Sequence, residues 1–272
     1  MSMNIERRLD WIPSFDERNK LYGIRGMFGS VPVERKAKFW KEGTVLDQGR
    51  EGACVGFGWL AELIAQPYTP DEQPTQEFGN KLAKLFYKEA QKIDEWPGDD
   101  YSGTSVLAGA KIMKQYGYID EYRWCFDIDD IIDAVVSQGP VVIGIPWYSG
   151  MYRTNSLGLT GPTGDNVGGH CITLTGYHPA KIFGRQSLEV FKWRNSWGKS
   201  YGVNGSGYIR VSDLRNLFEE GGEACIPVVR NKPVLTYPPR SVNKVSFWVM
   251  FVKKIIDWFM YRFTLPKAVR NK

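Results

Sequence analysis

Four chemically complementary side chains, set far apart along the chain, constrain its fold more than any other feature. Gln48 and Cys54 are separated by a glycine-containing loop, His170 follows a Gly-Gly pair, and Asn195 opens an Asn-Ser-Trp-Gly run. Acyl transfer by a thiol needs these residue types: a nucleophile, an imidazole that takes and returns a proton, an amide that fixes the ring, and a second amide for the oxyanion. A fold that uses them together brings the first half of the chain against the second.

The first half of this set lies in a region with helical periodicity. Apolar residues at helical spacing follow Cys54, namely Phe57, Leu60, Ala61, Leu63, Ile64 and Ala65. The thiol is therefore predicted at the N-terminal end of a helix, where the helix dipole and a nearby imidazolium would lower its pKa. A second helix is predicted over residues 78–93, and an acidic loop over 94–101 is expected to rim the cleft.

The second half has the pattern of a sheet. Short β-branched or aromatic runs bounded by Gly and Pro cover residues 141–145, 171–175, 188–193 and 208–211. We expect an α+β fold in which a helical lobe with the Cys faces an antiparallel β lobe with the His and Asn. A cleft between two such lobes suits an extended peptide.

These motifs resemble the papain-like cysteine peptidases over roughly residues 40–230, in particular bacterial and viral members that lack the usual disulfide and propeptide. The sequence around the nucleophile differs from the usual signature, because Gly52-Ala53-Cys54-Val55 has neither the upstream Cys nor the downstream aromatic residue. Asn195 lies 141 residues after Cys54 and His170 lies 116 residues after it. The first spacing fits the family, and the second indicates trimmed loops.

The resemblance implies a role for each residue of the set. Cys54 would be the nucleophile and His170 the general base. Asn195 would orient the imidazole, and Gln48 would form the oxyanion hole with the backbone N–H of Cys54. The expected function is hydrolysis of peptide bonds.

Three further residues are expected to bind substrate on the same basis. The run from Ser102 to Ser105 resembles the family's substrate strand, so Gly103 or Thr104 would present backbone groups to an extended peptide. Trp197 falls where the family places an indole over the Asn–His hydrogen bond.

Each residue also has an ordinary structural alternative. A Cys near a helix start is often a small buried hydrophobe, and Asn is a common turn former. His178 is the only other candidate base, but its position beside Pro179 favours a surface role. Ordinary roles are likewise expected for Cys171 in the core and for Asp47 and Glu51 in solvent.

Composition excludes several classes of function. The net charge of +5 over 272 residues is mild and the basic residues are spread, so no nucleic-acid partner is expected. The charged N-terminus lacks the apolar stretch of a signal peptide, which predicts a cytoplasmic protein. With Cys54 assigned, Cys125, Cys171 and Cys225 form neither metal-ligand spacing nor a disulfide pattern, so we expect no metal and no organic cofactor.

Four segments are predicted along the chain. Residues 1–40 are rich in turn formers and form an N-terminal strap, too short and too broken by Gly and Pro for a helical inhibitory propeptide. Residues 41–230 form the papain-like domain, residues 231–244 a Pro-containing linker, and residues 245–272 an aromatic and basic C-terminal segment.

The C-terminal segment has a distinct pattern. Residues 245–263 are apolar around most of a helix, with a polar stripe at Lys253, Asp257 and Tyr261. Internal charges argue against a transmembrane span. Three alternatives stay open: docking at an anionic membrane surface or in a partner groove, packing back onto the domain, and disorder.

Two other functions fit the same motifs. One is a catalytically inactive papain-like binding module. The other is a thiol hydrolase of cell-wall peptides or isopeptide bonds, which would use the same chemistry on a different substrate. Active-site titration with a thiol reagent separates the first from an enzyme.

Overall fold

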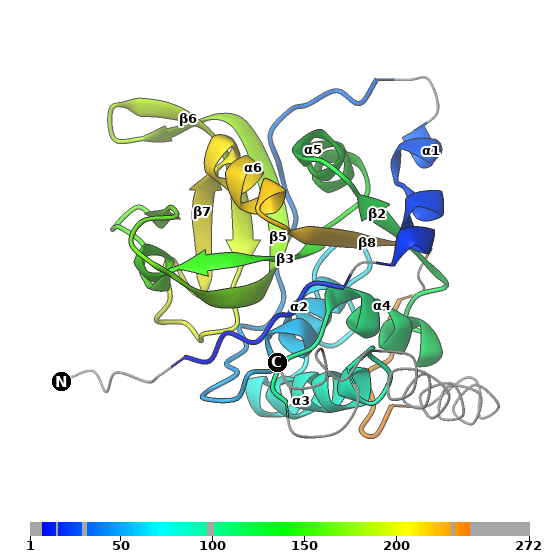
Figure 1. The fold of residues 1–272 in the computed structure, drawn as a ribbon. Helices are drawn as coiled ribbons and strands as arrows, with labels where there is room; N and C mark the ends of the chain where they lie inside the picture. Colours follow the sequence, from blue (N-terminus) through cyan, green and yellow to red (C-terminus); the bar gives the residue numbers. More distant parts are fainter. Residues whose placement is uncertain (1–6, 15, 29–31, 97–100, 230–231, 240–272) are drawn as a thin grey trace, which may run out of the picture.

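Three helices lie on one side of a long, mostly antiparallel sheet, two of them in contact with the sheet and the third packed on those two (Figure 1). In this computed structural model the described residues are 7–14, 16–28, 32–96, 101–229 and 232–239. The three helices are α2 (Cys54–Leu63), α3 (Gln76–Gln91) and α4 (Val106–Gln115). They form the helical lobe that the sequence predicts around Cys54.

Local sequence accounts for where these helices begin. The hydroxyl of Thr75 accepts a hydrogen bond from the backbone N–H of Phe78 at the start of α3, and Ser105 caps α4 in the same way through Ala108. Such caps satisfy backbone donors that a helix start leaves unpaired. Helix α2 has no side-chain cap and is buried along nearly its whole length, so packing is what fixes it.

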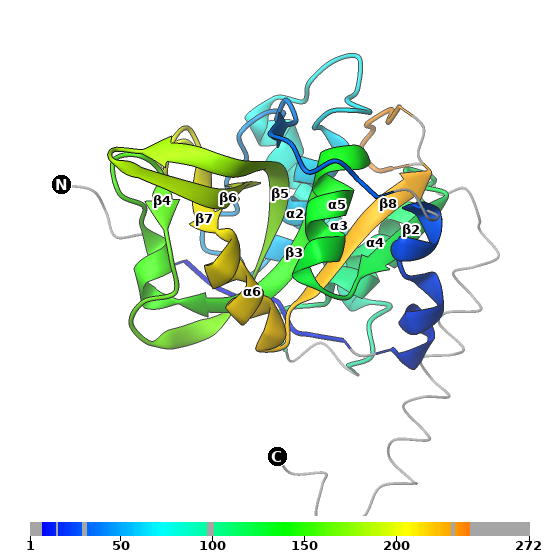
Figure 2. The same ribbon diagram turned by 90° about the horizontal axis from the view of Figure 1, so that it is seen from above.

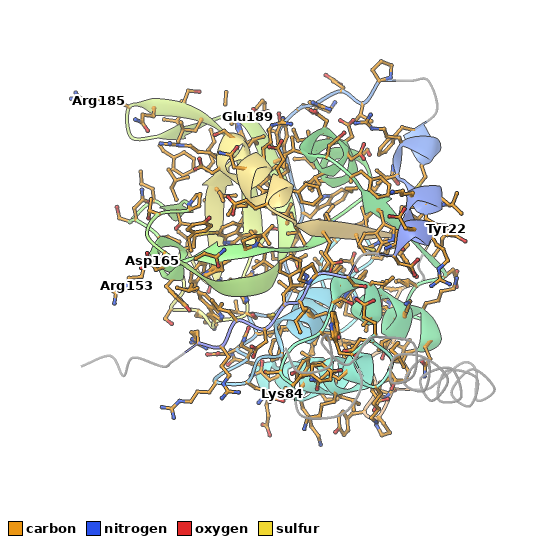
Figure 3. All side chains as sticks on the ribbon, in the orientation of Figure 1. Tyr22, Lys84, Arg153, Asp165, Arg185 and Glu189 are labelled. Atoms are coloured by element: carbon orange, nitrogen blue, oxygen red, sulfur yellow. The ribbon has the colours of Figure 1, made fainter. Side chains whose placement is uncertain are left out.

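Within the described ranges the sheet contains eight strands. Its main path runs in the order β2-β8-β3-β5-β6-β7-β4, with β1 paired to β5, and only the β4–β7 pair is parallel. The strands are β1 (Lys38–Phe39), β2 (Glu121–Cys125), β3 (Val141–Tyr148), β4 (Leu159–Thr160), β5 (Asn166–Phe183), β6 (Gln186–Arg194), β7 (Ser206–Arg210) and β8 (Glu223–Val229). The tip of the β5–β6 hairpin, marked by Arg185 in Figure 3, projects away from the helices.

Two helices cover the other face of the sheet. These are α5 (Ile128–Ser137) and α6 (Val211–Glu219), which lie in front of the sheet in Figure 2 with α2, α3 and α4 behind it. Strand β3 shows the division, because Val142 belongs to the core beneath α2 whereas Val141 and Ile143 belong to the core beneath α5 and α6. Alternation of this kind is expected of a strand buried on both faces.

Four short elements complete the described chain. They are η1 (Glu17–Tyr22), α1 (Arg25–Phe28) and η2 (Ser149–Tyr152), together with strand β1. Among the described residues, no helix is long and apolar enough to span a membrane.

The α+β fold class predicted from the sequence is confirmed, and two of its boundaries need correction. The run 208–211 is not one strand, because Val211 begins α6 after β7 ends at Arg210. The helix predicted over 78–93 runs from Gln76 to Gln91. Part of the predicted cleft-rim loop (97–100) and the whole C-terminal segment from residue 245 lie outside the described residues.

Candidate active site

Cys54 is the first residue of α2 and is completely buried. Burial raises the pKa of its thiol to about 11, which outweighs the lowering by backbone hydrogen bonds from Cys171 and Asp10. The negative charge of Asp10 raises this pKa further. The pKa lowering that the sequence predicts is therefore wrong for this conformation, in which the thiol is protonated at neutral pH.

His170 and Asn195 form a buried hydrogen-bonded pair. His170 lies on β5 opposite Ile145, and Asn195 follows directly after β6. The imidazole Nε2 is 2.9 Å from Asn195 Oδ1, and neither side chain is more than 2% exposed. The backbone N–H of Asn195 donates to Gly205 O at 3.0 Å, which fixes the loop that carries the amide.

The imidazole is neutral in this setting. Burial lowers the pKa of His170 to about 4, against a smaller raising effect of the Asn195 hydrogen bond. A neutral ring that donates from Nε2 has its acceptor at Nδ1. Nδ1 has no hydrogen-bond partner among the described residues.

Two indoles enclose the imidazole. Trp197 stacks on His170 with ring centroids 4.8 Å apart and an interplanar angle of 26°. Trp147 of β3 meets the ring edge-on at 4.7 Å. The two rings shield the His170–Asn195 hydrogen bond from water.

Gln48 connects the two halves of the site. Its Oε1 accepts a hydrogen bond from Ser196 Oγ at 2.5 Å, and its backbone N–H donates to Ser196 O at 2.8 Å. Its Nε2 donates to Glu51 O at 2.9 Å and to Arg8 O at 3.1 Å. The side-chain donor proposed for an oxyanion therefore contacts a backbone carbonyl from the N-terminal part of the chain.

Residues 7–12, here named the cleft segment, cross between α2 and the sheet (Figure 1). Trp11 N donates to Gly169 O at 2.9 Å on the sheet side. On the helical side, Ile12 N donates to Thr104 O at 3.1 Å and Thr104 N donates to Asp10 O at 3.2 Å. The backbone of the segment thus pairs with both edges of the cleft.

Glycines allow this close approach. A Cβ on Gly103 would lie 2.3 Å from Asp10 O, and one on Gly169 would lie 2.5 Å from Trp11 O. Gly103 also has a φ of +101°, which L side chains rarely adopt. Gly103 and Thr104, predicted as substrate-binding residues, therefore lie where an extended backbone is already bound.

Ion pairs border the site at two residues expected in solvent. Asp47 Oδ1 lies 2.5 Å from Arg7 Nη1, and Arg7 also donates to the carbonyls of Gly49 and Trp197. Glu51 pairs at 2.9 Å with Lys84 of α3 (Figure 3). Asp47 therefore holds the cleft segment in place, a role that the sequence did not indicate.

His178 and the cysteines other than Cys54, for which structural roles were expected, have the following environments. His178 lies in β5 and accepts a hydrogen bond at Nδ1 from Ala180 N, and all four cysteines are buried and free. No group of three or more His, Cys, Asp or Glu side chains in the described ranges could hold a metal ion.

A cavity of about 360 Å³ lies apart from this site. Its walls come from η1, the β2–α5 connection, α6 and the start of β8, and include Phe126, Phe218 and Glu223. Neither Cys54 nor His170 lines it.

Comparison with known protein families gives a match to the middle part of the chain. The family described as papain family cysteine protease matches residues 84–226, which is just over half of the sequence. This range contains His170 and Asn195, whereas Gln48 and Cys54 precede it.

Two curated proteins are similar over larger parts of the chain. An uncharacterized peptidase C1-like protein, L477, of Acanthamoeba polyphaga mimivirus is 22% identical over 247 residues, covering 73% of this chain and 74% of that protein. Cathepsin B of Dictyostelium discoideum is 27% identical over 183 residues, covering 61% of this chain and 51% of that protein.

Solved structures show the same fold at low identity. Xylellain, a cysteine protease from Xylella fastidiosa, aligns with a TM-score of 0.55 at 20% identity, covering 85% of this chain and 99% of its own. The bromelain protease of Ananas comosus, solved with the inhibitor E64, aligns with a TM-score of 0.51 at 15% identity, covering 74% of this chain and 100% of its own.

Proposed function

Because the chain belongs to the papain family of cysteine proteases, we propose that it hydrolyses peptide bonds through Cys54, His170 and Asn195, with Gln48 as oxyanion donor. The observation that carries this proposal is the buried hydrogen bond between His170 Nε2 and Asn195 Oδ1 beneath the indole of Trp197. A pair held in this way keeps the ring in one tautomer and orientation, with Nδ1 as its acceptor.

The proposed reaction has two stages. Sγ of Cys54 attacks the carbonyl carbon while its proton passes to His170, and the oxygen becomes an anion held by Gln48 Nε2 and the Cys54 N–H. The C–N bond then breaks as His170 gives that proton to the leaving amine. Water, deprotonated by His170, attacks the thioester, and the thiol and the carboxylic product are released.

Ionisation of the thiol depends on opening the cleft. In the closed conformation burial favours the neutral forms of both Cys54 and His170. Water that enters after the cleft segment leaves reduces this penalty, so the helix N-terminus and the imidazolium can stabilise the thiolate. Catalysis therefore requires the segment to leave first.

An extended substrate would use the backbone edges that the cleft segment occupies. Gly169 O, Thr104 O and Thr104 N each hold the segment by one hydrogen bond. These backbone groups come from the sheet side and the helical side of the cleft and do not depend on side-chain identity, so they suit peptide or protein substrates in general.

The test is covalent labelling with a peptidyl epoxide, read by intact mass, alongside cleavage of a mixed peptide library. We expect one adduct on the full chain, its loss in Cys54→Ala, and a steep fall in His170→Ala. Cys125→Ala is the matched control, since Cys125 is buried in the other core, and it should label normally.

The other functions are outcomes of the same test. Folded protein that gives neither an adduct nor cleavage would contradict an enzyme and favour the binding module. An adduct without cleavage of peptides, but with release of fragments from peptidoglycan or isopeptide-linked substrates, would replace the substrate class and keep the chemistry.

Membrane or partner contact through residues 245–263 stays a separate proposal. Sedimentation with anionic vesicles, compared between the full chain and a chain that ends at residue 230, tests it. Equal sedimentation of the two chains would contradict membrane docking.

A further inference from the structure

One carboxylate is buried beside the strand that leads into Asn195. The side chain of Glu42, which lies between β1 and Gln48 along the chain, is 9% exposed. Its Oε2 lies 2.7 Å from Arg194 Nη2 and 3.0 Å from Lys192 Nζ, and both cations belong to β6. An ion pair at this depth is little screened by water, so it constrains the residues that form it.

Two hydroxyl groups complete the surroundings of this carboxylate. Thr175 Oγ1 of β5 donates to Glu42 Oε1 at 2.6 Å, and Ser206 Oγ of β7 donates to Glu42 Oε2 at 2.9 Å. Together with the two cations of β6, these donors come from three neighbouring strands, whereas Glu42 itself comes from a segment outside them. A carboxylate bound in this way is held in one position and in turn holds its donors.

Arg194 connects the carboxylate to the loop after β6. While its Nη2 donates to Glu42, its Nη1 donates to the backbone carbonyl of Asn204 at 2.5 Å. Asn204 has a φ of +53°, a left-handed conformation that is uncommon outside glycine. The planar guanidinium therefore joins Glu42 to this turn by two hydrogen bonds of fixed relative direction.

The turn at Asn204 also holds the backbone of Asn195. Gly205, the next residue of the turn, accepts a hydrogen bond at its carbonyl from the Asn195 N–H at 3.0 Å. A Cβ on Gly205 would lie 2.8 Å from Arg194 Nη1, so the guanidinium packs directly on this turn. A continuous set of contacts thus runs from Glu42 through Arg194 to the backbone of Asn195.

The guanidinium depends on Glu42 for its position. Arg194 is 7% exposed, and burial lowers the pKa of its guanidinium whereas the charge of Glu42 raises it. A buried cation without an anion beside it is costly, so the side chain would turn towards water if Glu42 lost its charge. The hydrogen bond to Asn204 O would then be lost, and the turn that binds the Asn195 N–H would be less firmly held.

Resting on the proposed function, we propose that Glu42 is a positioning residue for catalysis. It acts through Arg194 on the turn at Asn204, and so fixes the amide of Asn195 that orients the His170 ring. Lys192 pairs with the same carboxylate, but its neighbour on β7 is Tyr208 and not this turn. Lys192 therefore contributes to stability alone.

The first test observes the ring and the loop without catalysis. Nitrogen NMR of the His170 imidazole distinguishes a proton on Nε2 from one on Nδ1, and the unsubstituted full chain should show Nε2 only. Glu42→Gln keeps the shape and an acceptor oxygen but removes the charge, so the signals should move towards a mixture of the two tautomers. Hydrogen exchange of the Asn195 N–H should become at least about 10-fold faster than in Lys192→Met, the matched control.

The second test measures turnover on a peptide substrate. Glu42→Gln should lower kcat about 10-fold and leave KM within about 2-fold, because Asn195 acts on proton transfer and not on substrate binding. In an Asn195→Ala background the same substitution should lower kcat less than about 2-fold, since the side chain that it positions is already absent. Lys192→Met should leave kcat within about 2-fold of the unsubstituted chain.

A second variant covers the case in which Glu42→Gln does not fold. Glu42→Asp keeps the charge but withdraws the carboxylate from Arg194 by one carbon. The same NMR, exchange and turnover comparisons with Lys192→Met then apply to it.

The outcomes distinguish this inference from the proposed function. Equal His170 tautomers and equal Asn195 exchange rates in Glu42→Gln and Lys192→Met would overturn the positioning role, even if Cys54 reacts with the epoxide. A fall in kcat of the same size with and without the Asn195 side chain would overturn it as well. The expected NMR changes without any Cys54 adduct in the unsubstituted chain would overturn the proposed function, and with it the catalytic role of Glu42.

Discussion

The two halves of the candidate site differ in accessibility. The sheet half, with His170 and Asn195, already has its side chains bound to one another, whereas the helical half, with Cys54 and Gln48, is covered. His170, Asn195 and Trp197 hold one another by a hydrogen bond and a ring stack that come entirely from β5 and the loop after β6. Cys54 and Gln48, by contrast, are covered by the cleft segment. Arg8 O of this segment accepts the hydrogen bond from Gln48 Nε2, and the Cys54 thiol is buried away from water. The orientation of the His170 ring is thus built into the fold, while access to Cys54 depends on a segment outside the helical lobe.

Removing the imidazole of His170, the proposed base, should have the largest effect on activity. His170→Ala should lower kcat/KM on a peptide substrate on the order of 10⁴–10⁶-fold, because thiol deprotonation and amine protonation both need the imidazole. The control is His178→Ala, which removes a His from the same strand away from the site and should leave the rate within about 2-fold. A fall in kcat/KM of less than about 10-fold in His170→Ala would contradict the proposal that His170 acts as the base.

Removing the side chain of Gln48, the proposed oxyanion donor, should have the second largest effect. Gln48→Ala should lower kcat on the order of 10²–10³-fold, since one proposed donor to the oxyanion, free of Arg8 O once the cleft segment leaves, is lost. Gln73→Ala is the matched control, because Gln73 donates to Ile64 O at 2.8 Å and has no contact with Cys54. Equal kcat values in the two variants would show that Gln48 only supports the loop next to Ser196.

The third prediction concerns the pH dependence of stability. The folded pKa of His170, about 4, lies below its unfolded value of 6.5, so the fold favours the neutral ring. This contribution is fully present above pH 6.5 and is lost as pH falls from 6.5 to 4, which amounts to about 3 kcal/mol. Urea unfolding across that range should show this loss in the unsubstituted chain relative to His170→Gln.

The comparison with a variant is necessary because Glu223 acts in the opposite direction. Burial raises its pKa from 4.5 to about 7, so it adds stability as pH falls through 7 towards 4.5. In the unsubstituted chain the two effects on the free energy of unfolding partly cancel, so its pH dependence alone does not reveal either one. A His170→Gln chain with the same pH profile as the unsubstituted chain would contradict the buried neutral imidazole.

Opening the closed half should have the smallest effect. Arg7→Ala removes the ion pair with Asp47 and two hydrogen bonds to backbone carbonyls, so the cleft segment should be held less firmly. We expect labelling of Cys54 by iodoacetamide to become about 10-fold faster, equivalent to about 1.4 kcal/mol. Arg18→Ala, which breaks an exposed pair with Asp16 away from the cleft, is the control. Equally faster labelling of Cys54 in both variants would indicate a general loss of stability and not release of the cleft segment.

The sequence predicted the assembled half better than the closed half, for a physical reason. Asn195 and His170 were identifiable because each lies in a short local pattern that requires its residue type. The contacts of Trp11 with Gly169 and Thr104 join segments far apart in the chain, and no local periodicity reports them. Glu223, which accepts a hydrogen bond from Trp11 Nε1 at 2.8 Å, went unpredicted for the same reason, since its place depends on the register of β8 against β3.

Two errors arose where a local rule met a stronger tertiary effect. The helix N-terminus predicted a lowered pKa for Cys54, but burial beneath the cleft segment dominates it. Val211 continues the apolar run of β7, yet it begins α6, whose buried face also includes Leu214 and Leu217. A short apolar run does not distinguish a strand from a helix start until its packing is known.

The cleft segment competes with any peptide for the same binding cleft. A peptide that enters the cleft has to displace a ligand that cannot diffuse away, because it is joined covalently to the domain it blocks. Tethered ligands of this kind reach effective concentrations of about the millimolar range, independent of how dilute the protein is. Dilution will therefore not activate the enzyme, and a substrate present at micromolar levels reaches Cys54 only during the intervals in which residues 7–12 have left the cleft.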